Sequence, residues 1–247
     1  MDVSIVIACY NESQHLEASV ETIKNIMDST RWSYELIFID DLSNDGTQDV
    51  LRKLMVKYPK WKYYFHDVNI GRGATVTEGF LKSGGSVVGF IDIDLEVPAY
   101  IMPALIVEII HGRYHVATAK RDYRIHLQII HRWLISRSYN LMVKKMLGVN
   151  LEDTETGCKF FYREKLLPIL LYTEDKRWFW DTEIMVNCYM ENLKIKELPA
   201  LFIRRLDKKS TVNLSLDIKD YFIRIINFRK KLKKVYKEQR RHGIRHL

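Results

Sequence analysis

Strand-like and helix-like segments alternate along the first hundred residues, and this alternation restricts the fold more than any other feature. Short runs rich in Val, Ile and Phe are typical of strands buried on both faces, whereas apolar residues three or four apart are typical of helices. Alternating strands and helices predict right-handed βαβ units and a mainly parallel sheet. The expected strands are 3–9, 34–39, 61–65 and 86–91, and the expected helices between them are 12–28, 47–58 and 71–82.

The rest of the chain continues this mixed pattern. The expected elements are a helix from 98 to about 111, a strand at 114–119, a helix at 125–147, a loop and short strand within 151–164, a helix at 182–192, one or two strands within 194–205 split at Pro199, and an amphipathic helix from 216 to about 239. We therefore expect an α/β domain over residues 1–215 and a basic amphipathic C-terminal helix over residues 216–247.

Polar residues follow several of the expected strands. In open parallel sheets, ligands bind beyond the carboxyl ends of the strands. The polar residues at such ends are Tyr10-Asn11-Glu12, Asp40-Asp41, Gly71-Arg72-Gly73 and Asp92 with Asp94. Their shared placement predicts a binding site at one edge of the sheet.

The stretch IDIDLEVP places three carboxylates, Asp92, Asp94 and Glu96, at alternate positions after an apolar run. Alternate side chains of an extended chain point the same way, so the three are expected to converge. Clustered carboxylates repel one another unless a cation neutralises them, and hard oxygen ligands favour Mg²⁺ or Mn²⁺. The alternative is a solvated acidic turn.

The positive charge of the chain is concentrated at its C-terminus. The net charge is +8, and residues 219–247 contain eleven lysines and arginines against two acidic residues. This asymmetry indicates one local anionic partner rather than nucleic acid bound across the fold. No apolar run reaches the roughly 18 residues of a membrane-spanning helix. We expect no signal peptide, and three distant cysteines without a CxxC predict neither a disulfide scaffold nor a structural zinc site, which fits a reducing cytosol.

Taken in order, the motifs resemble family 2 glycosyltransferases of the GT-A fold. The matching stretches are SIVIACYNE, IDDLSNDGT, NIGRGATVTEGF and IDIDLEVP, the last as the DxD element. The later stretches RWLISRSYN, DTETGCKFF and RWFWDTEI resemble the polyprenyl-phosphate branch, which contains dolichyl-phosphate mannosyltransferase and dolichyl-phosphate β-glucosyltransferase. The resemblance covers roughly Val3 to Asn213 and implies that residues 1–215 form a GT-A catalytic domain with a Rossmann-like sheet.

For the nucleotide sugar donor, the resemblance implies that Tyr10, Asn11, Glu12 and Asp40 hold the base and ribose. It also places Arg72 near the diphosphate, Asp92 at the donor sugar or ribose, and Asp94 with Glu96 at Mg²⁺ or Mn²⁺. Dolichyl-phosphate mannosyltransferases usually have Gln where Glu96 stands, so this chain adds a negative charge there.

For the acceptor, the resemblance implies that Arg121, Arg132 and Ser136 grip a lipid phosphate, and that Asp153 and Glu183 lie near the reacting centre. Arg132 and Ser136 are four residues apart on one helix face. In RRLDKKSTVN the family's glycine-serine-lysine pattern is degraded, and Arg205 with Lys209 are assigned to the same phosphate.

The expected activity is inverting transfer of a hexose from a UDP- or GDP-linked donor to a polyprenyl or dolichyl phosphate. The alternatives are transfer to a saccharide hydroxyl, for which Asp153 is the candidate base, and a non-catalytic nucleotide-sugar-binding module. A nucleotidyltransferase usually has a Gly-rich loop with a catalytic Arg or Lys near the first strand, and a dehydrogenase has GxGxxG there; YNESQH has neither. The basic tail is expected to bind an anionic membrane surface on the cytoplasmic side, to dock on a membrane-embedded partner, or to pack on the body. The donor sugar and base stay open.

Overall fold

The structure, a computed structural model, describes residues 1–123, 130–204 and 214–241, without the side chains of 130–132, 214–220 and 235–241. The chain divides into two compact units, residues 1–125 with 152–205 and residues 126–151 with 206–247. The second unit therefore includes 126–151, a segment that we expected in the first domain; the boundary between 215 and 216 stays a prediction.

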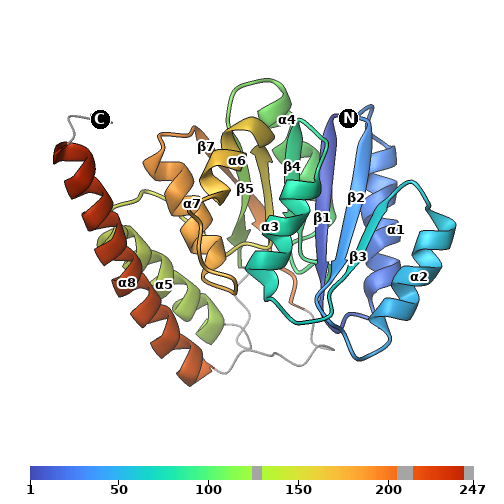
Figure 1. The fold of residues 1–247 in the computed structure, drawn as a ribbon, viewed down its shortest axis with the longest axis horizontal. Coiled ribbons are helices and arrows are strands. Elements are labelled where there is room, and N and C mark those ends of the chain that lie inside the picture. Colours follow the sequence, from blue (N-terminus) through green and yellow to red (C-terminus); the bar gives the residue numbers. More distant parts are fainter. Residues whose placement is uncertain (124–129, 205–213, 242–247) are drawn as a thin grey trace. The chain divides into compact units, whose positions relative to one another are not determined.

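The first unit is built on a seven-stranded sheet with the order β3-β2-β1-β4-β6-β5-β7 (Figure 1). Its strands are β1 (Val3–Cys9), β2 (Tyr34–Asp40), β3 (Lys62–Phe65), β4 (Val87–Ile91), β5 (Val116–Asp122), β6 (Cys158–Tyr162) and β7 (Ile195–Leu201). Strands β1 to β4 are parallel neighbours, and β7 is parallel to β5, whereas β6 runs antiparallel to both β4 and β5. The predicted α/β fold with a mostly parallel sheet is confirmed.

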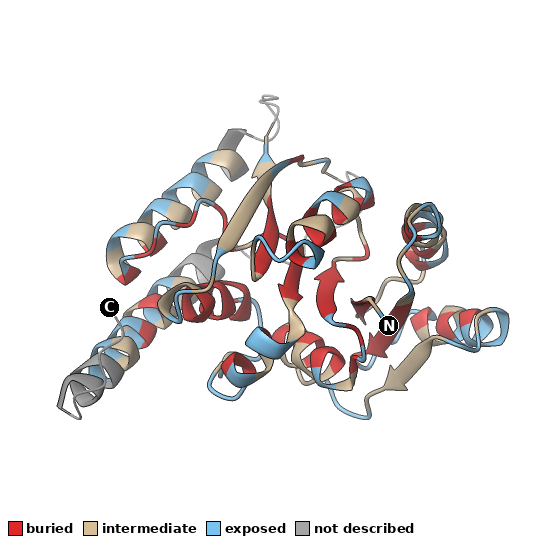
Figure 2. Cartoon of the chain, turned by 90° about the horizontal axis from the view of Figure 1, so that it is seen from above, coloured by how far each residue is buried: buried red, intermediate tan, exposed pale blue. Residues whose placement is uncertain are grey.

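Helices cover both faces of this sheet. Helices α1 (Leu16–Asp28), α2 (Thr47–Lys57) and α4 (Met102–Ile110), with the short helix η1 (Ala99–Ile101), bury apolar residues on one face. On the other face, α3 (Arg72–Lys82), α6 (Arg163–Leu170) and α7 (Trp180–Met190) surround an aromatic cluster. The cluster consists of Phe80, Phe90, Phe161 and Trp180, with ring centroids 5.7–6.3 Å apart. Buried residues concentrate in the central strands (Figure 2).

Three elements differ from what the sequence predicted. Helix α1 begins at Leu16 rather than 12, because Asn11 adopts a positive φ of 58° and the chain makes a turn first. Strand β7 continues through Pro199 instead of splitting there. It pairs only with β5 among the described strands, and a proline without an N–H is tolerated on such an edge strand. Helix α6 was not expected.

The second unit contains two helices, α5 (Ile130–Leu147) and α8 (Leu214–Arg241), which contact each other. On α8, Ile225 and Phe228 are buried as expected, but Phe222 is 46% exposed although its spacing placed it on the same apolar side. Tyr139 and Tyr221 form an edge-on pair with ring centroids 5.3 Å apart. Among the described residues, no helix combines the length and apolar character needed to cross a bilayer.

Candidate donor and acceptor sites

The carboxyl ends of β2, β1 and β4 are neighbours in the sheet, so the polar residues that follow them share one edge. At the end of β1, Asn11 donates its backbone N–H to Ser43 Oγ (2.9 Å) and accepts from the Asn44 N–H (2.9 Å), and the Glu12 N–H donates to Thr47 Oγ1 (2.7 Å). These bonds fix the turn after β1 to the turn after β2. Tyr10 is 49% exposed beside them.

Asp40 is the buried acceptor of this edge. Its side chain is fully buried, and Oδ2 accepts from the Ser43 N–H (3.1 Å) and from Gln48 Nε2 (2.8 Å). Its Oδ1 has no hydrogen-bond partner among the described residues. Because a buried acceptor without a partner is costly, this oxygen fits an N–H donor from a ligand, as a nucleobase supplies.

Asp41, which lies at the predicted edge but received no individual role, holds the turn before α3. Its carboxylate accepts from the N–H groups of Ile70 (2.8 Å) and Gly71 (2.9 Å) and contacts His66 Nδ1 (2.8 Å). Gly71 has a φ of +92°, and a Cβ there would lie 2.5 Å from the Lys176 carbonyl oxygen. A glycine is therefore required at this turn, and the turn places Arg72 at the helix start.

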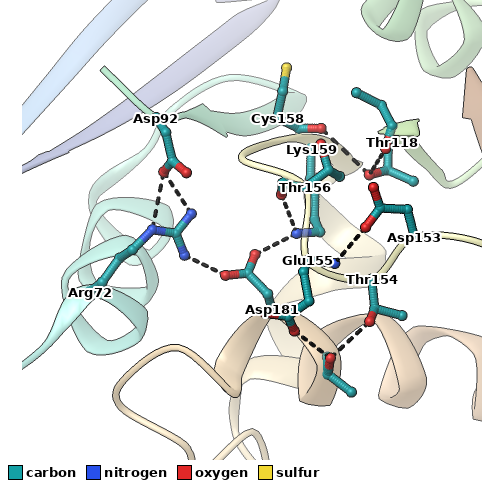
Figure 3. A network of polar contacts seen from close by, with 12 residues as sticks. Arg72, Asp92, Thr118, Asp153, Thr154, Glu155, Thr156, Cys158, Lys159 and Asp181 are labelled. Carbon is teal, nitrogen blue, oxygen red and sulfur yellow. Dashed lines mark hydrogen bonds and ion pairs between the residues drawn. The ribbon is translucent and has the colours of Figure 1, made fainter. Parts of the chain in front are cut away.

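Arg72 bridges two carboxylates. Its Nε and Nη2 donate to Asp92 Oδ1 (3.1 and 2.7 Å), and its Nη1 donates to Asp181 Oδ2 (2.5 Å) (Figure 3). The guanidinium carbon lies 5.0 Å from the Phe90 ring centroid and 5.5 Å from that of Trp178. Burial, and the nearby Asp94 and Asp181, raise the pKa of Asp92, while Arg72 opposes the shift.

The DxD segment is a turn and not an extended strand, which corrects our expectation that three carboxylates converge by alternation. Strand β4 ends at Ile91, the Leu95 N–H donates to the Asp92 carbonyl oxygen (3.1 Å), and Leu95 has a φ of +52°. The Glu96 N–H donates to Asp94 Oδ1 at 3.3 Å. Within the described residues, no three His, Cys, Asp or Glu side chains lie close enough to hold a metal ion together.

Two carboxylates still fit Mg²⁺ or Mn²⁺ if phosphate oxygens complete the coordination. Mg²⁺ commonly keeps few protein ligands and takes the others from substrate phosphates and water. Asp94 and Glu96 are both partly exposed in the turn that follows β4. The donor set therefore matches a metal shared between protein and diphosphate, and not an all-protein metal cage.

Near the end of β5, Arg121 is paired with Asp153. Arg121 Nε and Nη2 donate to the two Asp153 oxygens at 2.7 Å each, and the Arg121 backbone N–H adds a bond of 3.0 Å. Burial alone raises the pKa of Asp153, but the Arg121 charge and hydrogen bonds outweigh it and lower that pKa. A carboxylate so stabilised is a poor proton acceptor, so this environment does not suit the base role expected for Asp153.

Glu183 is likewise engaged by the backbone. It is 3% exposed, and its Oε2 accepts from the N–H groups of Glu174 (3.0 Å) and Asp175 (2.6 Å). Glu183 thus ties the loop before α7 to the first turn of that helix. This structural function explains why an acidic residue stands at position 183, and it does not require Glu183 to lie at the reacting centre.

The other acceptor residues belong to the second unit or lie outside the described residues. Ser136 lies on α5, in the second unit. The Arg132 side chain, Arg205 and Lys209 lie outside the described residues. Their approach to Arg121 stays a prediction.

Sequence reasoning missed Lys159, Asp181 and Glu155. Lys159 is fully buried, donates to the Thr156 carbonyl oxygen (2.6 Å) and is paired with Asp181 Oδ1 (Figure 3). All three residues lie inside the stretches DTETGCKFF and RWFWDTEI. A charged residue between apolar neighbours, as in GCKFF, was the signal for Lys159.

Glu155 is close enough to both ion pairs, Arg121–Asp153 and Lys159–Asp181, to feel their charges. It accepts a hydrogen bond from Thr182 Oγ1 (2.5 Å), which in turn contacts Thr154 Oγ1 (2.8 Å). Burial, followed by repulsion from Asp181, raises the pKa of Glu155 to about 7, although Thr182, Lys159 and Arg121 oppose the shift. Glu155 therefore gains a proton on folding near neutral pH.

We expect Glu155→Gln to stabilise the protein at pH 8 and to change little at pH 5. The folded-state pKa lies above the ordinary value of 4.5, so the native protein loses stability as pH rises between about 4.5 and 7. Removing the charge restores up to about 3 kcal/mol at pH 8. Thermal unfolding at both pH values measures this, with the exposed Glu17→Gln as control. A variant whose advantage does not grow with pH contradicts the assignment.

An open α/β fold with carboxylates and an arginine at the carboxyl ends of its parallel strands belongs to the class of folds that bind ligands at that edge. Comparison with known families narrows it: residues 4–169 match the model described as glycosyl transferase family 2. The chain belongs to this family, as the motifs indicated.

Two relatives agree with this assignment. The chain is 29% identical over 224 residues to glycosyltransferase AglD of Haloferax volcanii, covering 88% of this chain and 35% of AglD. It is 26% identical over 216 residues to dolichyl-phosphate beta-glucosyltransferase ALG5A of Trichomonas vaginalis, covering 80% of this chain and 64% of that protein. The chain thus spans only about one to two thirds of the length of these relatives.

The fold resembles that of glucosyl-3-phosphoglycerate synthase from Mycobacterium tuberculosis. Its complex with UDP has a TM-score of 0.66 and 17% identity, covering 93% of this chain and 80% of the synthase. A complex of the same synthase with Mn²⁺, UDP and glucosyl-3-phosphoglycerate has a TM-score of 0.59 and 20% identity, covering 83% of this chain and 74% of the synthase. At these identities the likeness establishes the fold.

Proposed function

We propose that this chain transfers a hexose from a UDP- or GDP-linked donor to a polyprenyl phosphate, with inversion at the anomeric carbon. The observation that supports this acceptor best is the buried Arg121–Asp153 pair. It supplies a fixed cation for a phosphate, while Asp153, the candidate base, is held by Arg121 and Glu183 accepts from backbone N–H groups. A phosphate acceptor is already ionised at neutral pH and needs no base, whereas a hydroxyl acceptor does.

The donor is held at the edge formed by β2, β1 and β4. Asp40 Oδ1 accepts a hydrogen bond from an N–H group of the nucleobase, and Asn11 and Glu12 lie beside the ribose. Asp92, oriented by Arg72, faces the donor sugar or the ribose. Asp94 and Glu96 would hold Mg²⁺ or Mn²⁺, which when bound neutralises the charge that grows on the leaving diphosphate.

In the reaction, an oxygen of the lipid phosphate attacks the anomeric carbon opposite the diphosphate. The new carbon–oxygen bond forms as the bond to the diphosphate breaks, and the electron pair leaves with the nucleotide. Arg121 binds and orients the attacking phosphate through its guanidinium, whose geometry matches phosphate oxygens. Positioning of the two substrates contributes to the rate enhancement, because it makes the reaction effectively unimolecular.

A donor and acceptor screen tests this proposal. UDP-glucose, GDP-mannose and UDP-GlcNAc are each incubated with the full chain, Mn²⁺ or Mg²⁺, and either a short polyprenyl phosphate or a saccharide. We expect a lipid-linked sugar of inverted anomeric configuration from one donor. Transfer to the saccharide alone overturns the acceptor assignment, and donor binding without any transfer indicates a binding module.

We also propose that the second unit lies peripherally on the cytoplasmic face of a membrane, where a lipid acceptor is found. Exposed apolar side chains of this unit lie on α5 and α8, and exposed basic residues on α8 accompany them. The apolar residues are Leu134, Leu141, Phe222 and Ile223, and the basic ones are Arg229, Lys230, Lys233 and Lys234. Apolar and basic groups together are the composition that binds anionic lipid surfaces.

We expect replacement of four α8 lysines by glutamine to weaken binding to phosphatidylserine vesicles by two to three orders of magnitude, since each lysine near the surface contributes about 1 kcal/mol. Vesicle sedimentation measures it. The changed residues are Lys230, Lys231, Lys233 and Lys234, and the matched control changes Lys53, Lys60, Lys165 and Lys194 of the first unit. Equal loss in both variants indicates a charge effect without a defined face, and no loss favours a packed helix or a protein partner.

A further inference from the structure

A fully buried lysine ends a chain of four alternating charges in the first unit. Lys159 has 0% of its surface exposed, and its ammonium contacts the Asp181 carboxylate and the Thr156 carbonyl oxygen. A buried ion pair contributes little to stability compared with apolar residues of the same size, since desolvation offsets the attraction. Stability therefore does not explain why Lys159 and Asp181 are in the core.

Asp181 divides its two oxygens between two cations. Oδ1 accepts from Lys159 and Oδ2 accepts from Arg72 Nη1 at 2.5 Å. Arg72 then directs Nε and Nη2 at a single oxygen of Asp92. The order Lys159, Asp181, Arg72, Asp92 alternates in sign and balances two positive with two negative charges (Figure 3).

Exposure rises along this order toward the ligand-facing edge. The side chains of Lys159 and Asp181 are 0% and 4% exposed, that of Arg72 is 14% exposed, and that of Asp92 is 37% exposed. Phe90 and Trp178 lie on the Arg72 guanidinium and restrict its rotation further. The buried end is thus rigid and the last carboxylate meets solvent.

We propose that Lys159 and Asp181 are positioning residues of the donor site. The Lys159 ammonium fixes the orientation of the Asp181 carboxylate, Asp181 fixes the Arg72 fork, and Arg72 turns Asp92 toward the donor. This inference rests on the function proposed above, because it assigns the orientation of Asp92 to donor binding. Because Asp92 is already oriented before the donor binds, its side chain loses little rotamer freedom on binding, and this favours binding.

The competing role is purely structural, and a charge-neutral double variant separates the two. Lys159→Met or Asp181→Asn alone leaves an uncompensated buried charge and lowers the Tm. Lys159→Met/Asp181→Asn removes one charge of each sign, and Arg72 and Asp92 still balance each other. We expect its Tm to approach that of the wild type, while its donor KM rises at least tenfold and its acceptor KM stays unchanged.

A double-mutant cycle of Arg72 and Asp181 tests the proposal if the Lys159→Met/Asp181→Asn variant folds poorly. Arg72→Met/Asp181→Asn is also charge-balanced, since Lys159 and Asp92 keep their charges. If Asp181 acts through Arg72, adding Asp181→Asn to Arg72→Met leaves the donor KM as it is in Arg72→Met alone.

Binding of UDP and of GDP with Mn²⁺, measured by calorimetry, gives a readout independent of turnover. A wild-type donor KM in the first double variant, or additive effects in the second, overturns the inference. Failure of the wild type to transfer any sugar or to bind either nucleotide contradicts the proposed function instead.

Discussion

Asp94→Asn is expected to lower turnover by about two to three orders of magnitude while leaving the fold intact. The residue is partly exposed in the turn after β4, so its loss creates no cavity. With one of two carboxylates gone, the turn no longer balances a divalent cation, and a Lewis acid supplies several kcal/mol to a leaving group that gains charge. Turnover with the donor identified by the screen, together with the Tm, measures both parts of the expectation.

Two variants serve as controls for Asp94→Asn. Glu96→Gln keeps an oxygen ligand at its position and is expected to retain most turnover, since dolichyl-phosphate mannosyltransferases usually have Gln there. Asp67→Asn removes an exposed acidic charge from the loop after β3 and is expected to change nothing. Because no three-ligand cluster is present among the described residues, Mn²⁺ is expected to bind far more tightly with UDP or GDP present than alone. Full turnover in EDTA contradicts the metal assignment.

The fold was predictable because buried parallel strands have a local signature. Strand β1 has the bounds expected from its apolar run, and β2 and β4 differ from theirs by one residue. The edge where Asp40, Arg72 and Asp92 gather followed from the rule that parallel strands end together. The predicted convergence of Asp92, Asp94 and Glu96 is wrong for a local reason. The chain leaves the extended conformation after Ile91, and Leu95 takes a positive φ.

The partners of the charged residues were not predictable, because they are distant in sequence. Arg72 and Asp181 are 109 positions apart, and Arg121 and Asp153 are 32 apart. The family resemblance suggested a place near the reacting centre for Asp153 and Glu183, but whether a carboxylate acts as a base depends on what surrounds it in the fold. Antiparallel β6, which brings Lys159 beside Asp181, had no local signal that distinguished it from a parallel strand.

Gly157 is required by the position of Asp92. The Asp92 N–H donates to the Gly157 carbonyl oxygen at 2.8 Å, so the loop before β6 and the turn after β4 are in contact. A Cβ on Gly157 would lie 2.7 Å from Asp92 Cγ, 3.0 Å from Asp92 Cβ, and closest to Oδ2. Rotation of the carboxylate relieves only part of this overlap, because the clash with Cβ requires the turn itself to move.

We therefore expect Gly157→Ala to lower kcat/KM at least tenfold, mainly by raising the donor KM. The free energy of unfolding is expected to fall by only about 1–3 kcal/mol. The carboxylate must leave the place where Arg72 holds it, so the donor site changes more than the core. Gly84→Ala is the matched control, because a Cβ there lies 3.5 Å from its nearest neighbour, Glu35 Oε1, which is ordinary contact. Steady-state kinetics and chemical denaturation separate the two effects. If Gly157→Ala keeps the wild-type donor KM, or loses stability and activity together as a core clash would, then Asp92 does not bind the donor in the orientation that Arg72 gives it.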